Sequence, residues 1–147
     1  MQDVLILGIG NPMRGDDGLG PWVAARLAAA GLNARAHAGD GTGILDAMAE
    51  TAHLVLIDAS QSGAPPGTPR RFDAAAATVP AEFFHYSTHR FGLAEAVETG
   101  RALGLLPAQL TVHAIEGGDF TAGERLSAPV AEAAEALILT LVAELGR

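Results

Sequence analysis

Two short, uninterrupted apolar runs constrain the fold of this chain more than any other feature. The first, Val4 to Leu7, leads into a Gly-Ile-Gly turn, and the second, Leu54 to Ile57, is stopped by Asp58. Apolar runs of this length beside turn residues are typical of strands buried on both faces, as in parallel sheets. A parallel sheet needs helices on both of its faces, so these runs predict a three-layer α/β/α sandwich.

The remaining segments alternate between helical and strand patterns. Helices are predicted at Pro21 to Ala30, Ile44 to Ala52, His89 to Leu103 and Pro129 to Leu145, and further strands at Ala34 to Ala38, Arg70 to Asp73 and Leu110 to Ile115. The alternation indicates a mostly parallel, twisted sheet of about five strands. We therefore expect one domain that covers residues 1–147, with the strand at 70–73 at an edge of the sheet because Pro69 is tolerated there.

Composition excludes several kinds of partner. Nine arginines stand against 17 acidic residues, for a net charge of -8, so no nucleic acid partner is predicted, because phosphate binding needs clustered basic residues. The chain has no cysteine, which excludes disulfides and thiolate ligands and favours a cytoplasmic location. The N-terminal run lacks the pattern of a signal peptide, and Ala136 to Ala143 is far shorter than the ~20 residues that cross a bilayer. No membrane partner is expected.

The glycine-rich turn after the first run comes close to two nucleotide-binding motifs but matches neither. The dinucleotide motif G-x-G-x-x-G fails at Met13, which occupies the place of the third glycine. Gly10 and Gly15 have the spacing of a phosphate-binding P-loop, but Asp16 and Asp17 follow where lysine and a hydroxyl residue belong. Two carboxylates would repel a phosphate, so a nucleotide-binding domain is not favoured.

What this turn does offer is an acidic loop at the carboxyl edge of the sheet, where open α/β folds place their ligands. The second strand delivers Asp58 to the same edge, and a helix that begins near His89 would add an imidazole. Two carboxylates and one imidazole suit a divalent cation such as nickel, zinc or manganese. The positive end of the helix would disfavour the protonated imidazole and keep His89 in the form that binds metal.

Each of these residues also has a purely structural interpretation. Asp16 or Asp17 is suited to cap the following helix. Asp58 at the end of a strand is typical of an Asx turn, and a lone histidine such as His89 is often a capping or partly buried residue. Glu116, at another predicted strand end, is a weak candidate for the site.

A serine nucleophile is not indicated. The serines occur without the G-x-S-x-G turn, and the metal-binding motif H-E-x-x-H is also absent. Any hydrolysis would therefore depend on a carboxylate or a metal-bound water to activate the attack.

Four blocks of sequence resemble one known family. The segment from Val4 to Gly20, VLILGIGNPMRGDDGLG, is similar to the N-terminal signature of the nickel-iron hydrogenase maturation proteases. Three further blocks agree with that family: Val55 to Ala59, Ser87 to Ala96, and Ile115 to Gly117 together with Leu126-Ser127. The loop around Asp40 resembles a family turn as well, so the similarity spans nearly the whole chain.

The resemblance implies an endopeptidase that removes a C-terminal extension from the precursor of the hydrogenase large subunit after nickel insertion. The family's catalytic and metal-contacting residues fall on Asp17, Asp58 and His89. The metal would be nickel carried by the substrate, with no tightly held cofactor. Some members have glutamate at the position of Asp17. The aspartate side chain is shorter by one carbon, or roughly 1.5 Å, so the metal geometry in this chain is expected to differ from theirs. A non-catalytic module that binds metal or an assembly partner stays open as the alternative.

Overall fold

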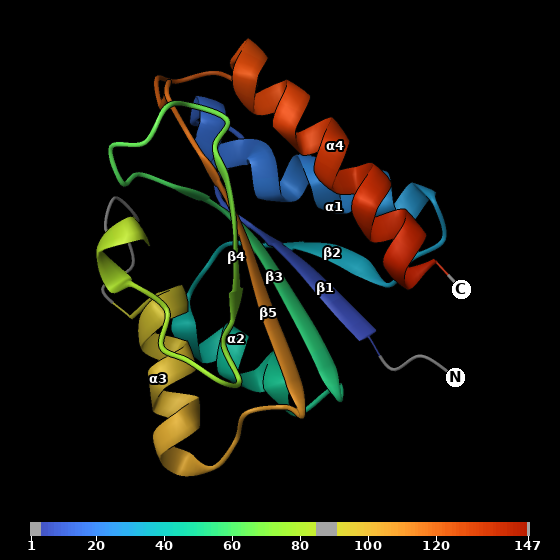
Figure 1. The fold of residues 1–147 in the computed structure, drawn as a ribbon, viewed down its shortest axis with the longest axis vertical. Coiled ribbons are helices and arrows are strands. Elements are labelled where there is room, and N and C mark those ends of the chain that lie inside the picture. The colour runs from blue at the N-terminus through green and yellow to red at the C-terminus, as the bar shows by residue number, and fades with distance from the viewer. Residues whose placement is uncertain (1–3, 85–90, 147) are drawn as a thin grey trace.

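A five-stranded sheet lies at the centre of the computed structural model, which describes residues 4–84 and 91–146 (Figure 1). Its strands are β1 (Val4–Ile9), β2 (Ala34–His37), β3 (His53–Ser60), β4 (Pro69–Asp73) and β5 (Gln109–Glu116). Their order across the sheet is β2-β1-β3-β5-β4. All neighbours are parallel except β4, which pairs antiparallel with β5 at the edge. The predicted α/β class and the edge strand are confirmed, and the sheet is mixed through this one pair.

Helices cover both faces of the sheet. They are α1 (Leu19–Ala29), α2 (Gly41–Met48), α3 (Leu93–Leu103) and α4 (Ala128–Leu145), with two short 3-10 helices, η1 (Gly15–Gly18) and η2 (Ala81–Phe84). Figure 1 shows α1 and α4 on one side of the sheet and α2 and α3 on the other, which is the predicted three-layer arrangement. No helix in the described part of the chain is long and apolar enough to cross a membrane.

The two predicted apolar runs form the centre of the core. In β1, Leu5 and Leu7 face the layer of α2 and α3, whereas Ile6 faces the layer of α1 and α4. Because successive side chains of a strand point to opposite faces, a strand between two helical layers must be apolar throughout. The helix α1 lies directly against β1 because Gly8 has no Cβ atom, which would collide with the backbone of Gly20.

Two helices start three or more residues away from the predicted position. The helix predicted from His89 begins at Leu93, and the N–H group of its cap Gly92 donates a 3.1 Å hydrogen bond to the side chain of Glu95. The helix predicted over Ile44 to Ala52 covers 41–48 instead, because Asp40 caps it three residues earlier than expected. Both starts are set by capping bonds that the apolar pattern does not reveal.

The buried histidine of β5 makes stability depend on pH. His113 is 8% exposed, and burial, together with the nearby Arg71 charge, lowers its pKa to about 4. The unfolded chain, with a histidine pKa of about 6.5, binds this proton more readily. The contribution of neutral His113 to the free energy of unfolding is therefore fully present above pH 6.5. It is lost as the pH falls toward 4, by as much as about 3 kcal/mol.

Replacement of His113 should make stability less dependent on pH. Urea unfolding between pH 7.5 and 4.5 should show a smaller loss of unfolding free energy in His113→Leu than in the wild type, and equal losses would contradict this assignment.

Candidate functional site

The parallel strands β1, β3 and β5 all end at one edge of the sheet, and three loops leave it there. These loops are residues 10–14, 61–68 and 117–127. Gly20, in the first turn of α1, lies over the ends of both β1 and β3, because a Cβ atom at this position would collide with the carbonyl oxygens of Ile9 and Ile57. This is the edge where open α/β sheets bind ligands, and it is the edge that the sequence predicts.

Asp17 lies in η1, which follows the loop after β1. It is 8% exposed, and its Oδ2 atom accepts a 3.1 Å hydrogen bond from the N–H group of Asn11. The loop approaches so closely that a side chain at Gly10, where φ is 144°, would collide with the Asp17 carbonyl. Asp17 is not the N-cap of α1, because Gly18 occupies that position. The capping interpretation is therefore wrong for this residue.

Asp58 lies inside β3 and not after it. The strand continues to Ser60 because residues 58–60 pair with the last residues of β5. Asp58 is 6% exposed, and its Oδ1 atom accepts a 2.8 Å hydrogen bond from the N–H group of Ala59. Asp58 therefore does not stand at the end of its strand, the position at which an Asx turn was expected. Since Gly8 of β1 pairs with Ile57, the structure brings Asp58 to the end of β1, close to the loop that carries Asp17.

The third predicted ligand, His89, lies outside the described residues. The helix that follows it begins at Leu93, four residues later than predicted, so the argument that a helix terminus keeps this imidazole neutral loses its premise. Within residues 4–84 and 91–146 there is no group of three or more histidine, aspartate or glutamate side chains placed to hold a metal ion. The set Asp17, Asp58 and His89 therefore stays a prediction.

Asp16 is a structural residue. It is completely buried, and its carboxylate accepts four hydrogen bonds of 2.8 Å, from the N–H groups of Gly118, Asp119 and Ser127 and from the Ser127 hydroxyl. All four donors belong to the loop between β5 and α4. Like Asp17, it caps no helix, so its carboxylate joins the first loop of the site to the last.

Glu116 holds the other side of the edge. This residue ends β5, is 2% exposed, and accepts hydrogen bonds from the hydroxyl groups of Ser60 and Ser62 at 3.0 and 2.8 Å. The N–H groups of Ser62 and Gly63 donate to its Oε2 atom at 2.8 and 3.2 Å. Glu116 therefore ties the loop that follows Asp58 to β5, and its role as a weak site candidate is replaced by a structural one.

The sequence did not predict that His37 and Asp40 form a polar pair at this edge. His37 ends β2; its Nδ1 atom accepts a 2.9 Å hydrogen bond from the N–H group of Gly39, and its Nε2 atom lies 3.9 Å from a carboxylate oxygen of Asp40. Asp40 caps α2 by accepting from the N–H group of Gly43 at 2.9 Å. That bond, followed by one from Thr42, lowers the pKa of Asp40. An aspartate three residues before Gly43 at a helix start is the sequence signal for this cap.

The chain matches one known protein family over most of its length. The hydrogenase maturation protease family (HycI) matches residues 39–144 of the chain. A comparison with curated protein sequences found no match.

Solved structures with the same fold include three maturation peptidases. The chain is similar to the hydrogenase maturating endopeptidase HybD from E. coli, with a TM-score of 0.78 and 25% identity over 99% of this chain and 92% of that one. It is similar to the endopeptidase HycI from E. coli, with a TM-score of 0.71 and 26% identity over 96% and 89% of the two chains. It is also similar to a hydrogenase 2 maturation peptidase from a Thaumarchaeota archaeon, with a TM-score of 0.66 and 25% identity over 99% of each chain.

Replacement of Asp16 should destabilise the fold strongly. In Asp16→Ala, the buried donors of Gly118, Asp119 and Ser127 lose their acceptor, at a cost of about 3 kcal/mol in the free energy of unfolding. Asp16→Asn keeps one acceptor oxygen and should lose less. Urea denaturation measures both, with Asp46→Ala, an exposed aspartate of α2, as the control that changes stability by no more than about 0.5 kcal/mol. Equal stability of Asp16→Ala and the control would refute the structural role.

Proposed function

This chain belongs to the hydrogenase maturation protease family, and from that premise we propose that it removes a C-terminal extension from the precursor of a nickel-iron hydrogenase large subunit after nickel insertion. It is an endopeptidase, and hence a hydrolase, as are the family and its solved relatives. A non-catalytic binding module, the alternative that the sequence left open, is therefore not its function. The proposal includes a cytoplasmic location, which the absence of cysteine supports.

One observation carries the proposed site: two buried carboxylates lie at the carboxyl edge of adjacent parallel strands, Asp17 in η1 after β1 and Asp58 two residues before the end of β3. Asp17 and Asp58 are 8% and 6% exposed, and each accepts a backbone hydrogen bond that orients its carboxylate. Oxygen and nitrogen ligands suit divalent nickel. We therefore assign to Asp17, Asp58 and His89 the contact with the nickel of the substrate, His89 being assigned from the family resemblance.

These residues explain how a nickel-loaded substrate would be selected. A precursor that already holds nickel adds a positive centre that the two carboxylates attract, whereas a precursor without metal offers them no cation. The chain has no cysteine, so it contacts nickel without offering the thiolate ligands that would compete for it. The metal then acts as a recognition signal that belongs to the substrate.

Peptide hydrolysis also needs a base that takes a proton from the attacking water. No serine of the chain lies in a G-x-S-x-G turn. The hydroxyl groups of Ser60 and Ser62 are bound to Glu116, and that of Ser127 to Asp16, in contacts that hold the loops together. A carboxylate at the edge, Asp17 or Asp58, is the group that we assign to this step. Nickel bound close to the scissile bond would bring that bond within reach of the same carboxylates.

Removal of either carboxylate charge should stop processing while the fold is kept. Asp17→Asn and Asp58→Asn preserve shape but weaken the contact with a cation, so each should lower the cleavage rate of a nickel-loaded precursor at least about 100-fold. Intact-mass spectrometry of the precursor measures the loss of the C-terminal peptide.

The matched control is Asp46→Asn, which makes the same chemical change on the exposed surface of α2 and should cleave at the wild-type rate. Circular dichroism verifies that all three variants are folded. Wild-type cleavage by Asp17→Asn and Asp58→Asn would overturn the assignment of the site.

A further inference from the structure

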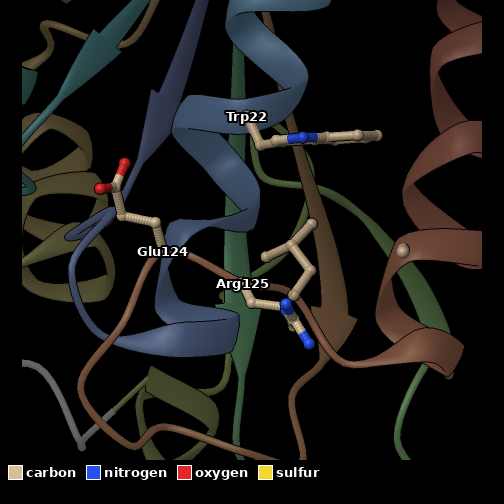
Figure 2. Close-up of a pocket in the computed structure, with 5 residues that line it drawn as sticks. Trp22, Glu124 and Arg125 are labelled. Carbon is tan, nitrogen blue, oxygen red and sulfur yellow. The ribbon is translucent and has the colours of Figure 1, made fainter.

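A cavity of about 600 Å³ lies beside the loop that joins β5 to α4 (Figure 2), and neither Asp17 nor Asp58 is among its lining residues. Its lining is formed by Trp22, Glu124, Arg125, Leu126 and Ala131. A second hollow of about 210 Å³ shares Arg125 and Leu126 and extends along the loop to Asp119 and Thr121. The first cavity alone has the volume of a typical ligand site, and the second adjoins it at the two shared residues.

The indole of Trp22 is held in place before any partner binds. The guanidinium of Arg26, one helical turn further along α1, stacks 5.2 Å from the ring centroid. Two hydrogen bonds of 2.8 and 3.1 Å to Glu135 of α4 fix that guanidinium. In Figure 2 the indole projects from α1 into the space above Arg125. An aromatic ring that is already ordered loses little entropy when a partner packs on it.

Arg125 supplies a positive charge that the described part of the chain does not neutralise. The side chain is exposed, and it forms no ion pair or hydrogen bond with any residue in the described ranges. Figure 2 shows its guanidinium at the lower end of the cavity, while the carboxylate of Glu124 points away from it. Ala131, in the first turns of α4, lines the same cavity, so the positive end of that helix adds to the preference for an anion.

We propose that this pocket is a docking site for a segment of the hydrogenase precursor in which an acidic side chain neighbours an apolar one. The acidic group pairs with Arg125, and the apolar group packs on Trp22 and Leu126. The inference rests on the proposed function and extends it to a second contact with the substrate. An isolated cation in a chain of net charge -8 selects a carboxylate, and the apolar lining selects a side chain that carries carbon beside it.

The position of the pocket favours a segment of the substrate over an unrelated ligand. Its loop is anchored through Asp119 and Ser127 to the carboxylate of Asp16, the neighbour of Asp17. A polypeptide whose nickel centre lies at Asp17 and Asp58 would extend over the neighbouring surface, and both hollows are lined by residues of the loop 117–127, which leaves the sheet at that edge. Two contact points on one substrate raise affinity without any change in the chemical step.

Steady-state cleavage of the nickel-loaded precursor tests this docking site. Arg125→Glu and Trp22→Ala should each raise KM about tenfold, because charge reversal and loss of an aromatic anchor weaken binding, and kcat should stay within about twofold. Trp22→Phe keeps a ring and should restore most of the affinity. The matched control is Arg35→Glu. Arg35 lies on β2, does not line the pocket, and forms a 2.9 Å ion pair with Glu50. Its KM should equal that of the wild type.

The outcomes separate the docking site from the proposed function. Normal cleavage with an unchanged KM in Arg125→Glu and Trp22→Ala overturns the docking site and leaves the function intact. If the wild type cleaves no precursor, the proposed function fails, and calorimetric titration with the same precursor still decides: weaker binding by Arg125→Glu than by Arg35→Glu supports the pocket, and equal or absent binding overturns it. A dimer that Arg125→Glu dissociates, with an unchanged KM, would identify a second copy as the occupant and refute the proposal.

Discussion

The hydrogen bonds that the buried carboxylate of Asp16 accepts hold together the carboxyl edge of the sheet, where the proposed site lies. A buried charge is costly unless donors replace the water that it loses, and here four donors at 2.8 Å do so. All of them come from the loop more than 100 residues further along the chain, so one side chain fixes two distant segments together. The loop after β1 and the loop after β5 thereby become one rigid unit.

This unit explains how two consecutive aspartates serve different purposes. Residues 15–18 form a 3-10 helix, in which successive side chains point about 120° apart. Asp16 is therefore directed to the β5–α4 loop, while Asp17 bonds to the N–H group of Asn11. Glu116 acts in the same way on the other side, where it holds the loop after Asp58 through Ser60 and Ser62. Asp17 and Asp58 therefore each stand next to a segment that a buried carboxylate fixes.

Much of the fold follows from local sequence patterns. Strands that are buried on both faces must be apolar throughout, and this identifies β1 and β3. Other local patterns indicate the edge position of β4 and the extent of α4. The extension of β3 to Ser60 depends on pairing with β5, and the start of α3 depends on a bond between Gly92 and Glu95. Neither interaction leaves a mark in apolar periodicity.

The site divides along the same line. Parallel topology alone brings Asp17 and Asp58 to one edge, so their location at the same edge follows from the strand pattern. The structural role of Asp16 could not be predicted, because its donors are backbone groups whose position depends on the tertiary fold. The same is true of the pocket at Trp22 and Arg125, which lie far apart in sequence. His89 remains a prediction from the family resemblance.

The central claim is that nickel in the substrate is the signal for cleavage, and the dependence of cleavage on that metal tests it most directly. The wild-type protein should be incubated with the same precursor in nickel-free and nickel-loaded forms, and the intact mass of the precursor followed over time. The account predicts loss of a C-terminal peptide from the nickel-loaded form only, with cleavage restored when the nickel-free form is reconstituted. Equal cleavage of both forms would contradict it.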